Sequence, residues 1–341
     1  MSATVSSPRI WPTSPAKHQE RYKGQGLWLD KTIYDWSLER AAAHPDVTAF
    51  PGLPQIATYA SLLADAEALG ASLWDLDIRP GDVISFQTPN WVEACVINLA
   101  AALCGFVINP IVTIYRDAEV KMMLADSASK AIFIAETYRK FDYLDMMRRL
   151  KPSLPDLQNT ILVRSAAAEG TLGYEDLIRA GKGRKAPAPR VDPNAIKLLL
   201  YTSGTTGRPK GVLHSHNSLA RATLAGVAHW GIKEGDAILM PSPVTHVSGY
   251  SNGLELPFLA GTRTVLMEAW NADAAVELID KHQVASTVAA TPFLAELVNS
   301  AQRAGSRLSS FVSFACGGAA VPPDIVRNAN RDFGRLVAFR V

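Results

Sequence analysis

The segment with the strongest chemical character is a polar loop at residues 202–211, between two apolar stretches typical of strands. The loop combines hydroxyl side chains, glycines and a lysine, namely Thr202, Ser203, Gly204, Thr205, Thr206, Gly207, Lys210 and Gly211. Glycine lets the backbone turn sharply and approach a ligand closely, and successive free N–H groups in such a loop form a concave site for anions. The hydroxyls add donors and the lysine adds a positive charge. These residue types predict a loop that binds a polyphosphate.

The spacing of the same loop disfavours a P-loop kinase or GTPase. Their pattern requires a glycine directly before the lysine and a serine or threonine directly after it. Here Pro209 precedes Lys210 and Gly211 follows it, and the chain returns to a strand rather than opening a helix. A polar surface hairpin without a ligand is the remaining alternative from the residues alone.

Two histidines follow the loop. His214 and His216 are two residues apart on a predicted strand, so both side chains would point to one face. That spacing suits zinc, but no cysteine lies near, no third ligand is evident, and His229 falls on the following helix. We therefore predict no metal site here.

The elements that must position the loop follow from an alternation of apolar strands and amphipathic helices. Before residue 166 the pattern predicts helices at 32–44, 61–76, 91–104, 118–125 and 141–150, and strands at 47–50, 82–87, 106–112, 131–135 and 160–164. A connection at 166–194 holds a short helical piece at 174–178, and strands follow at 196–201, 211–214, 237–240, 264–267, 285–288, 311–315 and 336–341. The alternation predicts an α/β fold of mainly parallel sheets covered by helices.

Composition narrows the class of protein. Of the 341 residues, 48% are hydrophobic and 19% charged, and the 34 basic and 32 acidic residues leave a net charge of +2, so the chain is typical of a globular protein. Nothing in that balance indicates a nucleic-acid or anionic-membrane partner. The three cysteines form no Cys-x-x-Cys pair, which argues against disulfides and structural zinc and for a reducing compartment, the cytoplasm.

Two segments need separate treatment. Residues 1–26 are rich in serine and contain Pro8, Pro12 and Pro15, which would break a helix, so we expect a disordered leader. Residues 94–115 carry no charge and are long enough to cross a bilayer. Gly105 and the Asn109-Pro110 pair interrupt them, so a buried helix followed by a buried strand is expected, and no membrane span.

The loop and two later motifs resemble a known family. The stretch YTSGTTGRPKG at 201–211 is similar to the phosphate-loop signature of the AMP-forming acyl-CoA synthetases, adenylation domains and luciferases. PVTHVSGYSNG at 243–253 resembles the next motif of that family, and CGGAAVPP at 316–323 resembles the segment that lines the adenine and acyl pocket. The likeness extends over residues 27–341. ISFQTPNW and NPIVTIYRDAEVKMML look most like medium-chain and cyclohexanecarboxylate acid–CoA ligases.

The resemblance implies a fold and a reaction. The fold would be the large N-terminal domain of an adenylate-forming enzyme, with one α/β subdomain at residues 60–215 and a second at 27–59 plus 216–341. In the implied reaction a carboxylate attacks the α-phosphate of ATP, with Mg²⁺ as cofactor, and an acyl-adenylate and pyrophosphate result. The thiol of coenzyme A, the co-substrate, then takes the acyl group and releases AMP. A small carboxylic acid is the partner expected, and no oligomeric state is predicted.

The resemblance also assigns residues to parts of the site. The residues implied to hold the β- and γ-phosphates are Thr202, Ser203, Gly204, Thr205, Thr206, Gly207 and Lys210. Gly317, Gly318 and Ala319 would let the adenine and the acyl group lie against the backbone. The substrate pocket would include His246, Ser248, Gly249 and Tyr250, although a lone histidine is more often structural. Beyond the support that Lys210 gives, no catalytic residue and no metal ligand is implied within the chain.

The class of acid is indicated by the second motif. Between residues 241 and 261 the only carboxylate is Glu255, whereas amino-acid-activating relatives supply an aspartate there for the substrate ammonium, since a buried cation needs a partner. The motif instead offers Val244, Val247, Tyr250 and Leu254. We therefore expect an apolar acid, either a medium-chain fatty acid or an alicyclic acid.

The sequence departs from the family at residue 341. Relatives continue with a Tyr-Gly-x-Thr-Glu segment, a ribose-binding aspartate and a C-terminal lid that carries a catalytic lysine. A closing lid excludes water and completes such a site, so we expect this chain alone to have little or no ligase activity. The alternatives are a non-catalytic remnant that binds a nucleotide or acyl group, and another adenylate-forming branch such as a luciferase-like oxygenase or a carrier-protein-loading domain.

Overall fold

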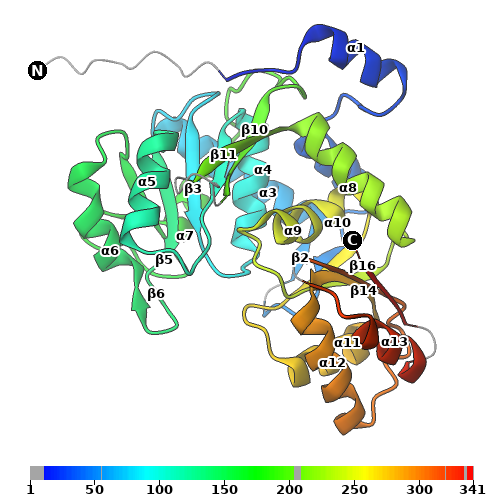
Figure 1. Cartoon of the computed structure of the whole chain (residues 1–341). Coiled ribbons are helices and arrows are strands. Elements are labelled where there is room, and N and C mark those ends of the chain that lie inside the picture. The colour runs from blue at the N-terminus through cyan, green and yellow to red at the C-terminus, as the bar shows by residue number, and fades with distance from the viewer. Residues whose placement is uncertain (1–10, 55, 203–208, 319, 334–335, 341) are drawn as a thin grey trace, which may run out of the picture. The chain divides into compact units, whose positions relative to one another are not determined.

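The computed structural model describes residues 11–54, 56–202, 209–318, 320–333 and 336–340. The chain divides into two compact α/β units (Figure 1). Unit 1 comprises Met1–Asp35, Leu63–Thr88 and Val96–Arg221, and unit 2 comprises Trp36–Leu62, Pro89–Cys95 and Ala222–Val341. Both units contain a sheet of mainly parallel strands with helices against it, which confirms the predicted fold class.

Unit 1 is built on a seven-stranded sheet in the order β11-β10-β4-β3-β5-β8-β9. All neighbours are parallel except the antiparallel pair β10 and β11. The strands are β3 (Val83–Gln87), β4 (Val107–Pro110), β5 (Ala131–Ala135), β8 (Asn159–Val163), β9 (Leu172–Gly173), β10 (Ile196–Thr202) and β11 (Lys210–Ser215). Every residue of β3, β4 and β5 is buried, as expected for strands that are covered on both faces.

Helices cover both faces of this sheet. Figure 1 shows α5 (Asp117–Ser127) and α6 (Tyr143–Leu150) on one side and α3 (Tyr59–Asp75) and α4 (Glu93–Cys104) on the other. One core cluster joins Val120 of α5 and Met147 of α6 to Ile132 and Ile134 of β5. On the opposite face, α7 (Tyr174–Gly181) places the ring of Tyr174 edge-on to Phe133, with centroids 6.5 Å apart. The short hairpin of β6 (Thr137–Tyr138) and β7 (Phe141–Asp142) occupies the start of the helix expected at 141–150.

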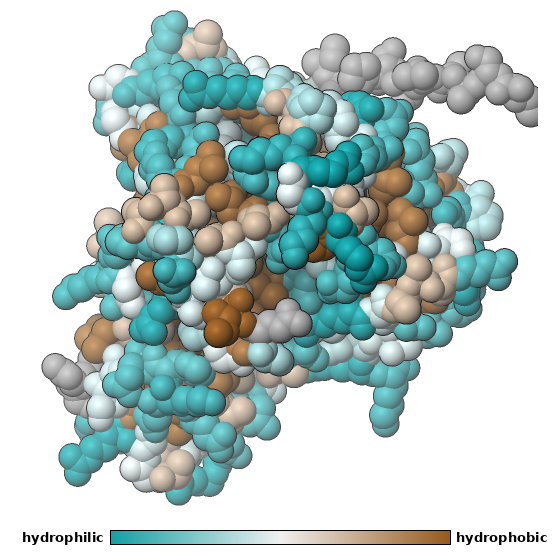
Figure 2. All heavy atoms as spheres, turned by 180° about the vertical axis from the view of Figure 1, so that it is seen from behind, coloured by the Kyte–Doolittle hydropathy of each residue, from teal (hydrophilic) through white to brown (hydrophobic). Residues whose placement is uncertain are grey.

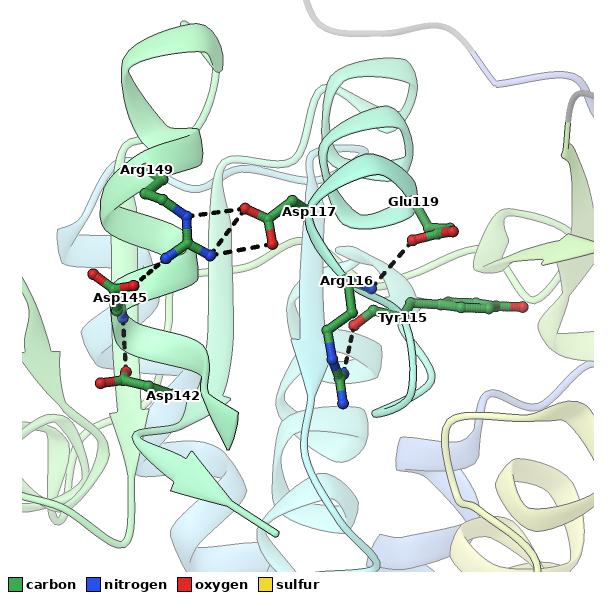
Figure 3. Close-up of polar contacts among 7 residues, drawn as sticks. All are labelled: Tyr115, Arg116, Asp117, Glu119, Asp142, Asp145 and Arg149. Carbon is green, nitrogen blue, oxygen red and sulfur yellow. Dashed lines mark hydrogen bonds and ion pairs between the residues drawn. The ribbon is translucent and has the colours of Figure 1, made fainter. Parts of the chain in front are cut away.

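Charged side chains connect α5 to α6 (Figure 3). The guanidinium of Arg149 donates to both carboxylate oxygens of Asp117, at 2.9 and 3.2 Å from Nη2, and also pairs with Asp145. Asp142 caps α6 by accepting a hydrogen bond from the backbone N–H of Asp145 at 2.8 Å. Because these groups are exposed, each ion pair contributes little to stability. The pairs nevertheless give Asp117 and Asp145 a counter-ion, Arg149.

The expected disordered leader is partly wrong. Residues 1–10 lie outside the described part, but α1 (Ala16–Gly24) is a helix, and the indole N–H of Trp11 donates to the carbonyl of Gly81 at 2.8 Å. The three leader prolines all precede residue 16, and Pro15 stands at the N-cap of α1, where no helical hydrogen bond is lost. Asp30 is also bound to unit 1, because its N–H donates to Asn217 Oδ1 at 3.2 Å.

The two histidines after the loop do not share a strand face. β11 ends at Ser215, so His214 lies on the strand while His216 begins α8 (His216–Trp230). His216 is 3% exposed, and within the described part of the chain its Nδ1 has no hydrogen-bond partner. Burial and the nearby charge of Lys197, itself 2% exposed, hold the pKa of His216 well below its usual value. The folded state therefore keeps this imidazole neutral.

This burial predicts an acid-sensitive stability. The unfolded chain protonates His216 near pH 6.5, whereas the folded chain resists protonation, so stability is fully present above about pH 6.5 and falls as the pH is lowered, by at most about 1.4 kcal/mol per pH unit. We expect His216→Gln to remove this contribution. The free energy of unfolding, measured with urea, should then fall less between pH 7.5 and pH 5.5 in the variant than in the wild type. His18→Gln, at an exposed position of α1, is the control. Equal slopes for wild type and His216→Gln would contradict the assignment.

Unit 2 contains a five-stranded sheet in which all neighbours are parallel, in the order β13-β12-β14-β15-β16. The strands are β12 (Ala237–Met240), β13 (Arg263–Leu266), β14 (Val284–Ala290), β15 (Ser313–Gly317) and β16 (Val337–Arg340). On one face, Leu239, Val265 and Phe314 pack with α11 (Ala272–His282), α12 (Thr291–Ala304) and α13 (Pro323–Asp332). On the other face, Ile238 packs with Leu256 of α10 (Leu256–Ala260).

The elements of unit 2 also include segments from the first hundred residues. They are α2 (Ile33–Ala43), which begins in unit 1, and the hairpin of β1 (Thr48–Phe50) and β2 (Ala57–Thr58). The phenol of Tyr59 donates to the carbonyl of Pro257 at 2.8 Å. Compared with the expected division into 60–215 and 27–59 plus 216–341, residues 27–35 pack with unit 1 and residues 89–95 with unit 2. Strand and helix patterns could not show this, because they do not reveal which sheet a connecting segment contacts.

None of the helices in the described ranges combines the length and the apolar character needed to cross a membrane. The uncharged stretch at 94–115 divides into α4 and β4, as the interruption at Gly105 predicts. On the face shown in Figure 2, apolar residues are interspersed with polar ones.

Asn90 binds the segment 89–95 into unit 2. Its Nδ2 donates to the carbonyls of Ser242 at 2.9 Å, Met267 at 3.0 Å and Met240 at 3.4 Å, and its Oδ1 accepts from the N–H of Val244 at 2.8 Å. Asn90 is 6% exposed, so these hydrogen bonds are shielded from water. One side chain thereby satisfies the backbone at the carboxyl ends of β12 and β13.

We expect Asn90→Ala to destabilise the protein by about 3 kcal/mol or more, because it leaves several buried backbone groups unsatisfied. Asn90→Asp should also destabilise it, since a carboxylate would face three carbonyl oxygens. Urea unfolding measures both, with the exposed Asn299→Ala on α12 as control. A loss for Asn90→Ala no larger than that of the control would show that the segment 89–95 is held by other contacts.

Candidate functional site

The two residues that flank the predicted phosphate loop are brought together by strand pairing. In the antiparallel pair of β10 and β11, Tyr201 lies opposite Gly211 and Thr202 lies opposite Lys210. Both Thr202 and Lys210 are exposed. Thr202 and Lys210 therefore lie opposite each other where β10 ends and β11 begins, and both side chains are accessible. Five predicted site residues lie outside the described part: Ser203, Gly204, Thr205, Thr206 and Gly207.

The predicted phosphate loop follows the carboxyl end of β10. β10 is parallel to β4, with Leu198 paired to Ile108. In open α/β sheets, ligands bind at the carboxyl ends of the strands. β11 then leaves this edge in the antiparallel direction, which is the return to a strand that distinguishes the loop from a P-loop.

A second set of predicted residues lies at the carboxyl edge of the unit 2 sheet. β12 ends at Met240, and the segment 241–246 leads into the short helix α9 (Val247–Gly249). His246 is exposed at the N-cap of α9 with an extended backbone, and its side chain makes no capping hydrogen bond. Ser248 is half-buried, and its carbonyl accepts from Asn252 Nδ2 at 2.9 Å. The imidazole is thus accessible, in contrast to that of His216.

Gly249 has no room for a side chain. A Cβ atom added there would lie 2.1 Å from the carbonyl oxygen of Pro243 and 2.7 Å from that of Ser242. Both are backbone atoms, so no rotamer change could relieve the overlap. The glycine thereby fixes how closely α9 approaches the segment that carries His246.

Tyr250 begins a π-helical segment, η2 (Tyr250–Glu255), which connects α9 to α10. Such wide turns often occur at functional sites. Tyr250 is fully buried and Glu255 is 1% exposed. Burial raises the pKa of the Tyr250 phenol well above its usual value, and the charges of Glu255 and Cys95 add to the effect. Tyr250 is therefore an interior residue of this segment.

The apolar residues expected to favour an apolar acid are mostly interior. Val244 and Leu254 are fully buried, and Val247 alone among them is exposed, at 37%. The charged residue of the segment, Glu255, is also buried, so burial and not only residue type decides which groups a ligand meets. Residue type alone gave no indication of this, because apolar residues occur at buried and at accessible positions.

The third motif reaches the same sheet edge. β15 ends at Gly317, and Gly318 follows with a φ of 73° and no heavy atom within 4 Å of an added Cβ. Strands β12 and β15 are parallel and separated only by β14, so their carboxyl ends lie about 10 Å apart. The topology thus brings the His246 segment and Gly317–Gly318 to one edge. Ala319 lies outside the described residues.

Asn90 and Trp91 are contributors to this edge that the sequence did not reveal. Besides the hydrogen bonds of Asn90, the indole of Trp91 donates to Glu268 Oε2 at 2.8 Å, just beyond β13. Their stretch was part of the resemblance, but no residue type in it suggested a contact 150 residues away. As for metals, within the described ranges no three His, Cys, Asp or Glu side chains gather as an ion would require.

One α/β unit thus carries the predicted phosphate loop, and the other carries His246 and the glycines after β15, as the resemblance to the adenylate-forming enzymes led us to expect. The profile of the AMP-binding enzyme family matches residues 38–339. The chain belongs to this family.

Individual relatives agree with that assignment. The chain is 30% identical over 328 residues to the medium-chain fatty-acid–CoA ligase of Escherichia coli, covering 96% of this chain and 58% of that protein. It is 28% identical to the vibriobactin-specific 2,3-dihydroxybenzoate-AMP ligase of Vibrio cholerae, covering 91% and 56%. The chain thus spans less than two thirds of the length of the curated relatives it matches.

Solved structures show the same fold. The apo structure of MbtA from Mycobacterium smegmatis superposes with a TM-score of 0.84 at 25% identity, covering 96% of this chain and 59% of that one. The inhibitor-bound N-terminal domain of FACL13 from Mycobacterium tuberculosis superposes with a TM-score of 0.79 at 25% identity, covering 91% and 75%.

The fit at Gly249 gives a testable prediction. Gly249→Ala must displace the backbone at residues 242–243, so we expect a loss of about 3 kcal/mol, in the range of an overpacked interior. Urea unfolding measures it. Gly24→Ala is the control, because an added Cβ at Gly24 meets no atom within 4 Å. A Gly249→Ala protein as stable as wild type would show that the segment is free to shift.

Proposed function

We propose that this chain is the nucleotide- and acid-binding part of an AMP-forming acid–CoA ligase that activates an apolar carboxylic acid. The observation that carries the proposal is the pairing of Thr202 with Lys210 at the base of the family's phosphate loop. The pairing holds an exposed donor and an exposed cation on the two arms of one turn, which suits the β- and γ-phosphates of ATP.

In this reaction a carboxylate oxygen attacks the α-phosphorus of ATP and the bond to the β-phosphate oxygen breaks. Pyrophosphate leaves with a gain of negative charge, which Lys210 and the Thr202 hydroxyl would stabilise. Magnesium, when bound with ATP, would neutralise further phosphate charge. The thiolate of coenzyme A then attacks the acyl carbon, and AMP leaves.

On the acid side, His246 is the exposed polar group next to the tightly packed Gly249. Gly318 leaves open space at the end of β15, where a flat adenine or an acyl group could lie against the backbone. The relative from Escherichia coli supports a medium-chain fatty acid by its name. An aryl acid is the second candidate, because the Vibrio cholerae relative is an aryl-acid AMP ligase at nearly the same identity.

Substitution of Lys210 should affect binding of the triphosphate but not binding of the adenylate. We expect Lys210→Met to weaken ATP binding at least tenfold, which corresponds to about 1.4 kcal/mol. Binding of 5′-O-(N-octanoylsulfamoyl)adenosine, an adenylate analogue without β- and γ-phosphates, should be unchanged. Isothermal titration calorimetry measures both ligands, with the exposed Lys281→Met on α11 as control.

The outcomes distinguish the alternatives. Equal losses for both ligands would show that Lys210 supports the fold instead of the triphosphate. Tighter binding of the salicyl sulfamoyl-adenosine than of the octanoyl analogue would favour the aryl acid. If the wild-type chain bound none of the three ligands, that is, ATP and the two analogues, the proposal would be overturned.

A further inference from the structure

Unit 1 contains a cavity of about 320 Å³ that shares no residue with the three motifs described above. It is lined by residues of α6, of the 3₁₀ turn η1 (Lys151–Ser153) that continues it, of β8 and of the segment 169–171. A volume of this size lies at the lower end of the range for small-molecule sites.

The floor of the cavity is apolar and its rim is basic. Leu144, Met147, Arg148 and Lys151 line it, and their spacing of three, four and seven residues places them on one face of the helix. Leu144 and Met147 are 5% and 1% exposed, whereas Arg148 is exposed and Lys151 half-buried. This face of the helix therefore combines an apolar surface with two cations.

These two cations have no counter-ion within the described part of the chain. The neighbouring Arg149 takes both nearby acids, Asp117 and Asp145, as Figure 3 shows. Glu169 is the acid of the lining, and it forms no ion pair there with Arg148 or Lys151. The lining thus carries two positive charges and one negative charge.

A polar group also meets the cavity from the sheet. Thr160 of β8 lines it and is only 3% exposed. The sheet thus contributes one polar side chain to a lining whose other groups come from α6, η1 and the segment 169–171.

We propose that this cavity binds a small amphiphilic carboxylate, separate from the adenylation site. The guanidinium of Arg148 offers two parallel N–H donors that match a carboxylate, and Lys151 adds a point charge. The apolar body of the ligand lies against Leu144 and Met147. Basic residues in the last turn of a helix also favour its dipole, which is the structural role that the experiment must separate from binding.

The test uses the full chain labelled with ¹³C at the methionine methyl groups. The Met147 resonance is assigned by its loss in Met147→Leu, and octanoate is titrated against 1-octanol as the uncharged probe. The shift of the Met147 signal during each titration gives an apparent affinity. We expect this affinity to be at least tenfold higher for octanoate than for 1-octanol. The double variant Arg148→Gln/Lys151→Gln should weaken the octanoate response at least tenfold.

A matched control removes the same charge elsewhere in unit 1. Lys121→Gln/Lys140→Gln changes two exposed lysines outside the cavity lining and should leave the Met147 response unchanged. No shift of Met147 with octanoate, an equal response to 1-octanol, or an equal response in the double variant would each overturn the proposal. Because the readout is local to Met147, it stands or falls independently of ATP binding and of ligase activity.

Discussion

The side chain of Asn90 makes hydrogen bonds with four backbone groups at the carboxyl edge of the unit 2 sheet. A parallel strand that ends inside a protein leaves carbonyl and N–H groups that must find partners. Asn90 supplies them at the ends of β12 and β13, although it belongs to a segment that directly follows β3 of unit 1. The carboxyl edge of the second sheet is therefore completed by residues far away in the sequence.

That edge and its counterpart in unit 1 give the chain two accessible sets of groups. In unit 1, the pairing of β10 with β11 fixes Thr202 and Lys210 at the base of the predicted phosphate loop. In unit 2, His246 is exposed while its neighbours Gly249 and Tyr250 are buried, so the same motif supplies both an accessible imidazole and a rigid support. The antiparallel return of β11 accounts for the first arrangement, whereas in unit 2 the parallel topology brings the His246 segment and the end of β15 to one edge.

The burial of residues in the segment 241–261 bears on the class of carboxylic acid that the protein would activate. The single carboxylate between residues 241 and 261, Glu255, is 1% exposed, so a substrate ammonium would not meet it without a rearrangement of η2. Two of the apolar residues taken to favour an apolar acid, Val244 and Leu254, are equally inaccessible. The proposed substrate class therefore relies on the absence of an accessible counter-ion and on the relatives, more than on an apolar lining.

The sequence by itself determined the fold class and most of the strands and helices, because strand and helix periodicity are local properties. The phosphate chemistry that it predicts for the loop around Lys210 stays a prediction. The sequence misplaced His216 by one residue at a strand end, treated residues 16–24 as disordered, and assigned residues 27–35 and 89–95 to the wrong unit. Only the tertiary structure decided those points, as well as the burial of Glu255 and the role of Asn90. The physical reason is that burial and side-chain-to-backbone hydrogen bonds across 150 residues depend on which surfaces meet, and no local pattern records that.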